Sequence, residues 1–187
     1  MIRTLKIDAE SLKELLKLDC STGKLTFNGE RVWLTRPEMI GFIQKWIVNL
    51  AGESLLESVY EAGKECAQKD FEILKRMMEL PEDIKSLLEV LSSFYASMGW
   101  GKISVETVEK DKIIFTLENS PIASVYEHSD ITVCGYFSGY SAGLISKATN
   151  RDWNAVEIEC EATGKPKCRF QIGEKTRKQL LMEKYSV

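Results

Sequence analysis

The sequence lacks the features that mark a membrane or a secreted protein. No uninterrupted apolar run approaches the roughly 20 residues that a membrane-spanning helix needs. The N-terminal stretch MIRTLKIDAESLKELL has no apolar signal-peptide core and carries acidic residues early. The five cysteines are an odd number, which argues against a disulfide framework. We therefore expect a cytoplasmic protein, in which thiols stay reduced and clustered cysteines indicate metal binding or redox chemistry.

The chain also lacks the charge and the motifs of several functional classes. Its 187 residues carry a formal net charge of −3, and the basic residues are spread along the chain, so nothing favours direct binding of nucleic acid. We find no dinucleotide fingerprint, no P-loop and no flavin signature. The single histidine, His128, is expected on the surface or in a loop. An enzyme is therefore not favoured.

What is present begins with a hairpin and helices. Residues 1–20 predict a short amphipathic helix or a loose leader. The stretch TGKLTFNGERVWLT alternates apolar and polar residues around Asn28-Gly29, a favoured two-residue turn, and predicts a hairpin. Apolar residues at helical spacing then predict three helices, over residues 37–52, 54–78 and from 81 to about 99.

The second half changes to strands. Residues 102–120 alternate around a turn at Asp111 and predict two strands, and a third is expected at residues 122–126. A helix is predicted over residues 130–150, with Asp130 or Thr132 as its N-cap. A hairpin over residues 153–172 and a helix from about Glu174 complete the chain. This order predicts an α+β fold with an antiparallel sheet, in one compact unit with an N-terminal region of hairpin and helices (1–99) and a C-terminal region (100–187).

One predicted helix carries three glycines, Gly135, Gly139 and Gly143, at four-residue spacing. That spacing places them on one stripe of the helix. Each glycine costs about 1 kcal/mol of helix stability against alanine, so something must offset the loss. Close packing against the sheet or another helix is one explanation, and a ligand against the bare backbone is the other.

Three cysteines mark a candidate site. Cys134 heads the glycine-bearing helix, and Cys160 and Cys168 flank the turn in CEATGKPKC. Three thiols are one short of the usual four ligands of structural zinc, and Glu157 or Glu159 are possible fourth ligands. Strand alternation places both carboxylates on the face opposite Cys160, so either reaches the site only if the strand bulges or ends there. From spacing alone a disulfide, a metal site and simply buried thiols all stay open.

Two stretches together resemble the 4-vinyl reductase domain. They are CGYFSGYSAGL and EIECEATGKPKCRF, and the resemblance covers about residues 100–173. It implies a zinc site formed by the Cys at the head of the glycine helix, a Glu three residues before a Cys, and the final Cys of the hairpin. In this chain these are Cys134, Glu157, Cys160 and Cys168. The set is closed, so the resemblance implies a structural zinc ion that joins the helix to the hairpin.

The N-terminal part resembles the sensor domains of bacterial activators that respond to phenol, toluene and related aromatics. The matching features are GERVWL, the helix that follows it, and EAGKECAQKD. Those sensors hold a hydroxyl with a His and a Trp, which this chain does not supply; Leu117 stands where the Trp is expected, so a more apolar ligand than phenol would follow. We expect the ligand-binding residues among the apolar side chains Phe94, Met98, Trp100, Ile113, Phe115, Leu117, Phe137 and Tyr140.

The leading hypothesis is a non-enzymatic, zinc-containing sensor or carrier that binds a small hydrophobic or aromatic molecule. Members of the wider fold, including vesicle-tethering subunits of the TRAPP complex, are dimers that enclose acyl chains. The resemblance therefore implies a homodimer, possible contacts with a partner protein, and a contact surface on the helix at 37–52 with Trp46. The alternatives are a reductase acting on a vinyl-bearing tetrapyrrole and a redox regulator in which thiol oxidation ejects zinc.

Overall fold

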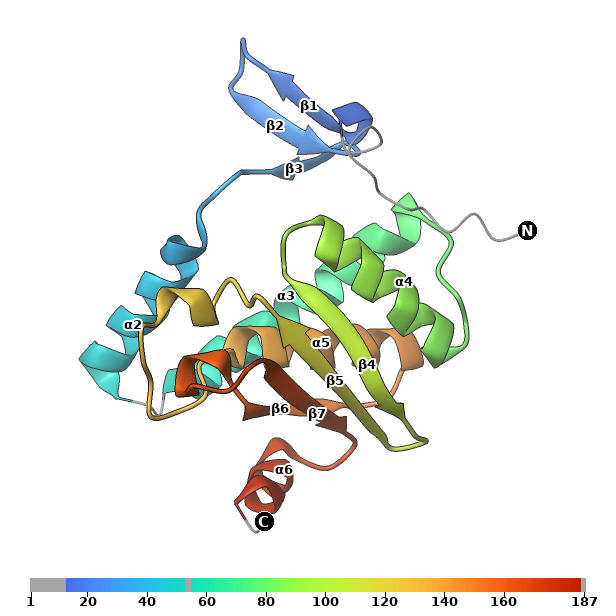
Figure 1. The fold of residues 1–187 in the computed structure, drawn as a ribbon. Coiled ribbons are helices and arrows are strands. Elements are labelled where there is room, and N and C mark those ends of the chain that lie inside the picture. Colours follow the sequence, from blue (N-terminus) through green and yellow to red (C-terminus); the bar gives the residue numbers. More distant parts are fainter. Residues whose placement is uncertain (1–12, 53–54, 186–187) are drawn as a thin grey trace.

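A computed structural model describes residues 13–52 and 55–185 of the chain. Helices combine with two antiparallel sheets, so the expected α+β class is confirmed. Figure 1 shows the smaller sheet standing apart at one end, joined by an extended segment to α2. The larger sheet lies in front of the long helices α3 and α5 in this view. No helix within the described part of the chain is both long and apolar enough to cross a bilayer.

The smaller sheet contains the predicted N-terminal hairpin. Its strands are β1 (Leu16–Asp19), β2 (Lys24–Phe27) and β3 (Glu30–Val32), in that order. Asn28 and Gly29 both have positive φ, as a tight two-residue turn requires. The expectation of a helix or leader over residues 1–20 is wrong for Leu16–Asp19, because this stretch pairs with β2 as a third strand. The rest of that prediction, at residues 1–12, lies outside the described residues.

The three predicted N-terminal helices are confirmed. They are α2 (Pro37–Ala51), α3 (Leu56–Met77) and α4 (Ile84–Ser97). Pro37 stands in the first turn of α2, where a missing N–H is tolerated. Helix α4 begins at an N-cap, Asp83, whose side chain accepts a hydrogen bond from the Ser86 amide at 2.9 Å.

The larger sheet has the strand order β4-β5-β7-β6. Its strands are β4 (Lys102–Val108), β5 (Lys112–Glu118), β6 (Asn154–Glu159) and β7 (Cys168–Gly173). All three neighbouring pairs are antiparallel. The predicted strand pair and C-terminal hairpin are therefore confirmed, although the connection between β6 and β7 contains a short 3₁₀ helix, η3 (Glu161–Thr163).

Two predicted elements between β5 and the glycine-bearing helix are wrong. The third strand at residues 122–126 is instead a 3₁₀ helix, η2 (Ala123–Val125). The Ser120 hydroxyl accepts a hydrogen bond from the Ala123 amide at 3.2 Å, which turns the chain there. Helix α5 (Gly135–Thr149) begins after Cys134 and not after Asp130 or Thr132. The chain before it is held by a tertiary contact, because Gln44 donates to the Val133 carbonyl at 2.7 Å.

The C-terminal helix α6 (Arg177–Lys184) begins later than the predicted Glu174. Thr176 and Gln179 form a capping box, in which each side chain accepts a hydrogen bond from the other residue's backbone amide. Such a box satisfies two amides that otherwise lack partners at a helix start. It therefore fixes the first residue of the helix at Arg177.

The glycine stripe on α5 packs against α3. A Cβ atom at Gly139 would lie 1.9 Å from the Tyr60 carbonyl oxygen, and one at Gly143 would lie 2.3 Å from that of Lys64. Gly63 of α3 meets α5 in the same way, with the Tyr136 carbonyl at 2.2 Å from its missing Cβ. The bare backbones thus allow the two helices to touch, and close packing is the reason for the stripe.

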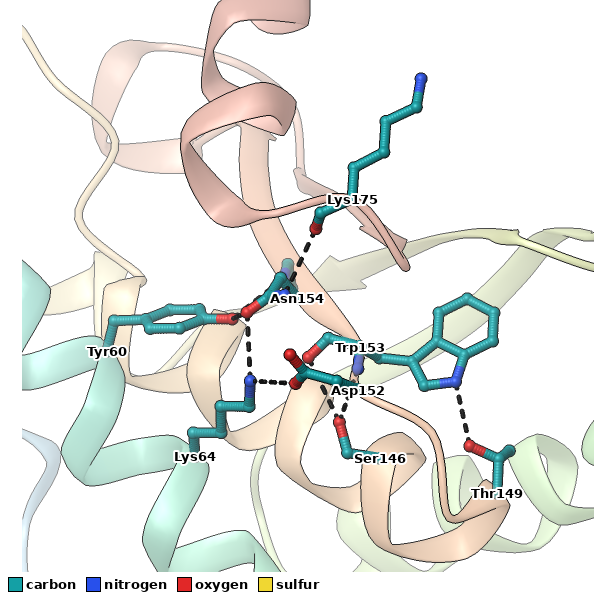
Figure 2. A network of polar contacts seen from close by, with 9 residues as sticks. Tyr60, Lys64, Ser146, Thr149, Asp152, Trp153, Asn154 and Lys175 are labelled. Atoms are coloured by element: carbon teal, nitrogen blue, oxygen red, sulfur yellow. Dashed lines mark hydrogen bonds and ion pairs between the residues drawn. The ribbon is translucent and has the colours of Figure 1, made fainter.

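A polar network joins α3 to the start of β6 (Figure 2). The Tyr60 hydroxyl accepts a hydrogen bond from the Ala155 amide at 3.0 Å and lies 3.5 Å from Asn154 Oδ1. Lys64 Nζ donates to Asn154 Oδ1 at 3.1 Å and pairs with Asp152 at 2.9 Å. Helix α3 is therefore attached both to α5 and to the edge of the sheet that carries Glu157.

Candidate functional site

Four side chains from three segments form a metal-type cluster. Cys134 is the N-cap of α5, Glu157 lies in β6, Cys160 directly follows β6, and Cys168 opens β7. One ligand atom of each lies within 4.8 Å of the others, and all four residues are buried. The structure thus brings together all four residues that the resemblance implied as ligands.

A bulge in β6 decides between the two candidate carboxylates. Glu157 pairs with Phe170 and Glu159 pairs with the next residue, Arg169, so Ile158 has no partner of its own. The extra residue shifts the alternation of the strand. Glu157 therefore reaches the same side as Cys160, whereas Glu159 does not belong to the cluster. The bulge that the sequence required is present.

Hydrogen bonds hold the ligand atoms in place. The Cys134 amide donates to Glu157 Oε2 at 2.8 Å. The Ser120 hydroxyl lies 3.4 Å from Cys134 Sγ, and the Glu161 amide donates to Cys168 Sγ at 3.4 Å. Such contacts orient metal ligands and stabilise thiolates. They come from the turn before η2 and from η3, the segments that surround the cluster.

The chemistry of the cluster fits a bound cation. Glu157 Oε1 is buried and has no hydrogen-bond partner within the described residues. Burial raises the pKa of the Glu157 carboxyl well above its usual value. Hydrogen bonds from Cys160 and Cys168, together with burial, raise the pKa of the Cys134 thiol. Each shift reports the cost of placing negative charge there alone, and a divalent metal ion would remove that cost.

A groove of about 460 Å³ runs between the smaller sheet and helices α3 and α4. Four of the eight predicted ligand residues line it: Phe94, Met98, Trp100 and Tyr140. Its volume lies within the range typical of small-molecule sites, roughly 300–1,000 Å³.

A second, smaller cavity of about 40 Å³ lies between α4, α5 and the larger sheet. Phe115, Phe137 and again Tyr140 line it. The remaining two predicted ligand residues, Ile113 and Leu117, are fully buried in the core and line neither space. Tyr95 and Tyr140 line both the cavity and the groove, so these two side chains stand between them.

Sequence reasoning missed two polar residues of the groove, Asp70 and Tyr95. The Tyr140 hydroxyl donates to Asp70 Oδ2 at 2.7 Å, and the Tyr95 and Tyr140 hydroxyls lie 2.7 Å apart. The signal for Asp70 was weak, because a carboxylate in an otherwise charged helix is usually solvated. Only its position opposite Tyr140 of α5 distinguishes it.

Helix α2 presents one face to the protein and one to solvent. On the inner face, Gln44 is buried, and Lys45 donates to the Val125 carbonyl at 2.8 Å. The outer face, here called the α2 surface, consists of exposed apolar side chains at helical spacing: Met39, Phe42, Ile43, Trp46 and Leu50. Exposed apolar patches of this kind mark interaction sites in soluble proteins.

Comparison with known proteins gives both sequence and structural relatives. An uncharacterized protein of Methanocaldococcus jannaschii is 25% identical over 122 residues, which is 65% of this chain. The match spans 66% of that relative, just under two thirds of its length. The structure is similar to the phenol-responsive sensory domain of the transcription activator PoxR, solved with phenol. The TM-score is 0.76 and the identity 20%, over 94% of each chain.

It is also similar to a vinyl-4-reductase family protein from Methanocaldococcus jannaschii. Here the TM-score is 0.54 and the identity 18%, over 77% of this chain and 84% of the other. At these identities the structural likeness shows a shared fold. It extends over both regions that the sequence resemblance distinguished.

A family model, that of the 4-vinyl reductase domain, covers the part of the chain that carries the cluster. The match runs from residue 113 to residue 174, from β5 to just past the end of β7. It includes all four cluster residues. Residues 113–174 of this chain form a 4-vinyl reductase domain.

Proposed function

We propose that the chain is a non-enzymatic sensor or carrier domain that binds a small hydrophobic or aromatic molecule in the groove and is held together by a zinc ion. The observation that carries the proposal is the groove itself, because its size suits a small molecule and apolar side chains of three helices and a sheet line it. The fold shared with a phenol-responsive sensory domain supports the same reading.

The groove is a better ligand site than the cavity. A cavity that holds benzene measures about 150 Å³, whereas the cavity here measures about 40 Å³. A ring therefore enters the cavity only if Tyr95 or Tyr140 moves. In the groove, by contrast, a ring fits beside Phe94, Met98 and Trp100 without rearrangement.

The geometry of the sulfur atoms supports zinc. Cys134 Sγ lies 3.7 Å from Cys168 Sγ, which lies 4.0 Å from Cys160 Sγ. A tetrahedral zinc ion with Zn–S bonds of about 2.3 Å requires sulfur atoms about 3.8 Å apart. Three thiolates and one carboxylate fill four positions, so the ion would be structural and would tie α5 to β6 and β7.

The α2 surface supports a homodimer. Its side chains lie on one stripe of α2, and Trp46 at its centre is 65% exposed. A second copy that packs its own α2 surface against this one would bury both stripes, as in a two-fold interface. Ligand binding would then be transmitted to a partner protein through the dimer and not by turnover.

The two alternatives have less support. None of the contacts within the described residues favours the reduction of a vinyl tetrapyrrole. The redox reading requires oxidant to reach the thiols, yet Cys134, Cys160 and Cys168 are all fully buried. Turnover of a vinyl tetrapyrrole with a reductant would revive the first alternative, and reversible zinc loss under mild peroxide would revive the second.

Ligand binding is tested on the full chain by native mass spectrometry of protein purified without added ligand, followed by thermal-shift assays with small aromatic and aliphatic compounds. We expect a bound or stabilising compound. Met98→Trp, which fills the groove, should abolish the effect, whereas Leu18→Trp on the exposed side of β1 should not. The absence of any bound or stabilising compound would contradict the proposal.

The metal is tested by elemental analysis of protein purified without added metal. About one zinc per chain is expected for a closed site of four ligands. Cys134→Ser should remove the metal and lower the melting temperature, whereas Cys20→Ser, at an exposed thiol outside the cluster, should change neither. A Cys134→Ser variant with full metal content and an unchanged melting temperature would overturn the zinc site.

A further inference from the structure

The groove contains a carboxylate without a cation. Asp70 lies on α3, is partly buried, and forms no ion pair with any residue of 13–52 or 55–185. Its printed contacts are the Tyr140 hydroxyl at 2.7 Å and the Cys66 thiol at 3.9 Å, both to Oδ2. Oδ1 is therefore open to another donor. A carboxylate withdrawn from water favours the approach of a positive charge.

The tyrosines beside Asp70 can only accept hydrogen bonds from a ligand. The Tyr140 proton is directed at Asp70, so the Tyr95 hydroxyl must supply the proton in the bond between the two tyrosines. Burial raises the pKa of both hydroxyls, and the charge of Asp70 adds to it, so both keep their protons. The polar end of the groove thus presents acceptors and no free donor.

The walls of the groove suit an organic cation. Six aromatic side chains line it: Phe27, Trp33, Phe94, Tyr95, Trp100 and Tyr140. The faces of aromatic rings attract ammonium groups, most strongly when water is excluded. The charged residues that line the groove are Asp70, Glu30 and Arg31, which give a formal balance of −1. Glu30 is already paired with Arg76 at 2.6 Å, so Asp70 remains the unpaired charge.

We infer that the groove selects a small molecule with an aromatic or alkyl body and a cationic ammonium head, which binds Asp70 while the body lies against the aromatic walls. The inference rests on the proposed function, because it assigns the ligand class of the same groove. It departs from the expectation of a wholly apolar ligand, since that expectation considered Leu117 and not Asp70.

The test compares three probes of nearly the same shape on the full chain by isothermal titration calorimetry near neutral pH. Benzylamine is cationic there, benzyl alcohol is neutral but donates a hydrogen bond, and toluene does neither. We expect benzylamine to bind at least about tenfold more tightly than benzyl alcohol, as one favourable cation–carboxylate and cation–π contact allows. Toluene should bind most weakly.

Two variants of α3 make the test specific. Asp70→Asn should bring the benzylamine-to-benzyl alcohol ratio to about one, because the charge is lost while the side-chain shape is kept. Glu65→Gln removes the same charge from the exposed side of the same helix and should leave the ratio unchanged. Thermal unfolding of each variant shows whether it is folded, and the probe ratio on the unmodified chain decides the question if Asp70→Asn is not.

The outcomes separate the two proposals. If benzyl alcohol and toluene bind as tightly as benzylamine, the cationic class is wrong while the groove remains a ligand site. If none of the three probes binds and no other compound does, the proposed function fails. A ratio that persists in Asp70→Asn would show that another group reads the charge, and would overturn the role of Asp70.

Discussion

The carbonyl oxygen of Tyr60 in α3 lies 1.9 Å from the point where a Cβ atom would stand at Gly139 in α5. No real Cβ contact is that short, so only glycine fits at this crossing of the two helices. Because α3 belongs to the N-terminal region and α5 to the 4-vinyl reductase domain, this crossing attaches the two regions to each other.

Gly139→Ala should therefore destabilise the protein strongly. The added methyl group meets a helix backbone that cannot rotate away, and overpacking of this kind costs about 3 kcal/mol. Gly135→Ala is the matched control, because its Cβ would have only one neighbour, the Leu56 carbonyl at an ordinary 3.8 Å. Chemical denaturation measures both; equal stabilities would show that the helices lie farther apart.

Glu157→Gln should weaken zinc binding, because the amide keeps the shape of the side chain and removes the negative ligand. We expect a loss of at least about tenfold in competition with a coloured chelator, since weaker changes around metal sites already cause 10–100-fold losses. Glu159→Gln removes the same charge two residues away, outside the cluster, and should have no effect. The reverse result would mean that the bulge in β6 lies elsewhere.

Four tyrosines should resist ionisation until the protein unfolds. Burial raises the pKa of Tyr60, Tyr95, Tyr136 and Tyr140 above the usual value of 10. The folded state keeps these protons while the unfolded state releases them, so stability is complete below about pH 10 and falls as the pH rises further. Absorbance near 295 nm should therefore rise in step with loss of circular dichroism; early titration of all six tyrosines would contradict the burial.

Trp46→Glu should convert the proposed dimer into a monomer. A charge at the centre of the α2 surface would have to be buried without a partner, which disfavours association. Light scattering after size exclusion measures the mass, and Leu18→Glu, which changes an exposed apolar residue outside the α2 surface, should leave it unchanged. A monomeric parent protein, or a dimeric Trp46→Glu variant, would place the α2 surface outside the interface.

The metal cluster could be read from the sequence because residue type and spacing limited the choices. Three cysteines and a carboxylate were few enough to assign, and the alternation of the strand showed that a bulge was needed for Glu157 to join Cys160. The bulge itself was not visible, because it depends on how β6 pairs with β7. Local pattern thus gave the ligands, and pairing gave their geometry.

Tertiary contacts explain most of what the sequence could not show. The start of α5 depends on Gln44, which is far away in the chain and holds the Val133 carbonyl. The groove depends on the smaller sheet lying beside α4, which no periodicity within either element records. Asp70 became a candidate only when Tyr140 was found against it.

Strand β7 is the last strand of the larger sheet along the chain, yet it lies inside that sheet between β5 and β6. During synthesis, β4 and β5 therefore emerge with one edge open, and β6 has no neighbour until Cys168–Gly173 has left the ribosome. The sheet and its cysteine cluster are completed in a single late step. A nascent chain stalled before this strand would expose unpaired strand edges, the kind of surface that chaperones cover.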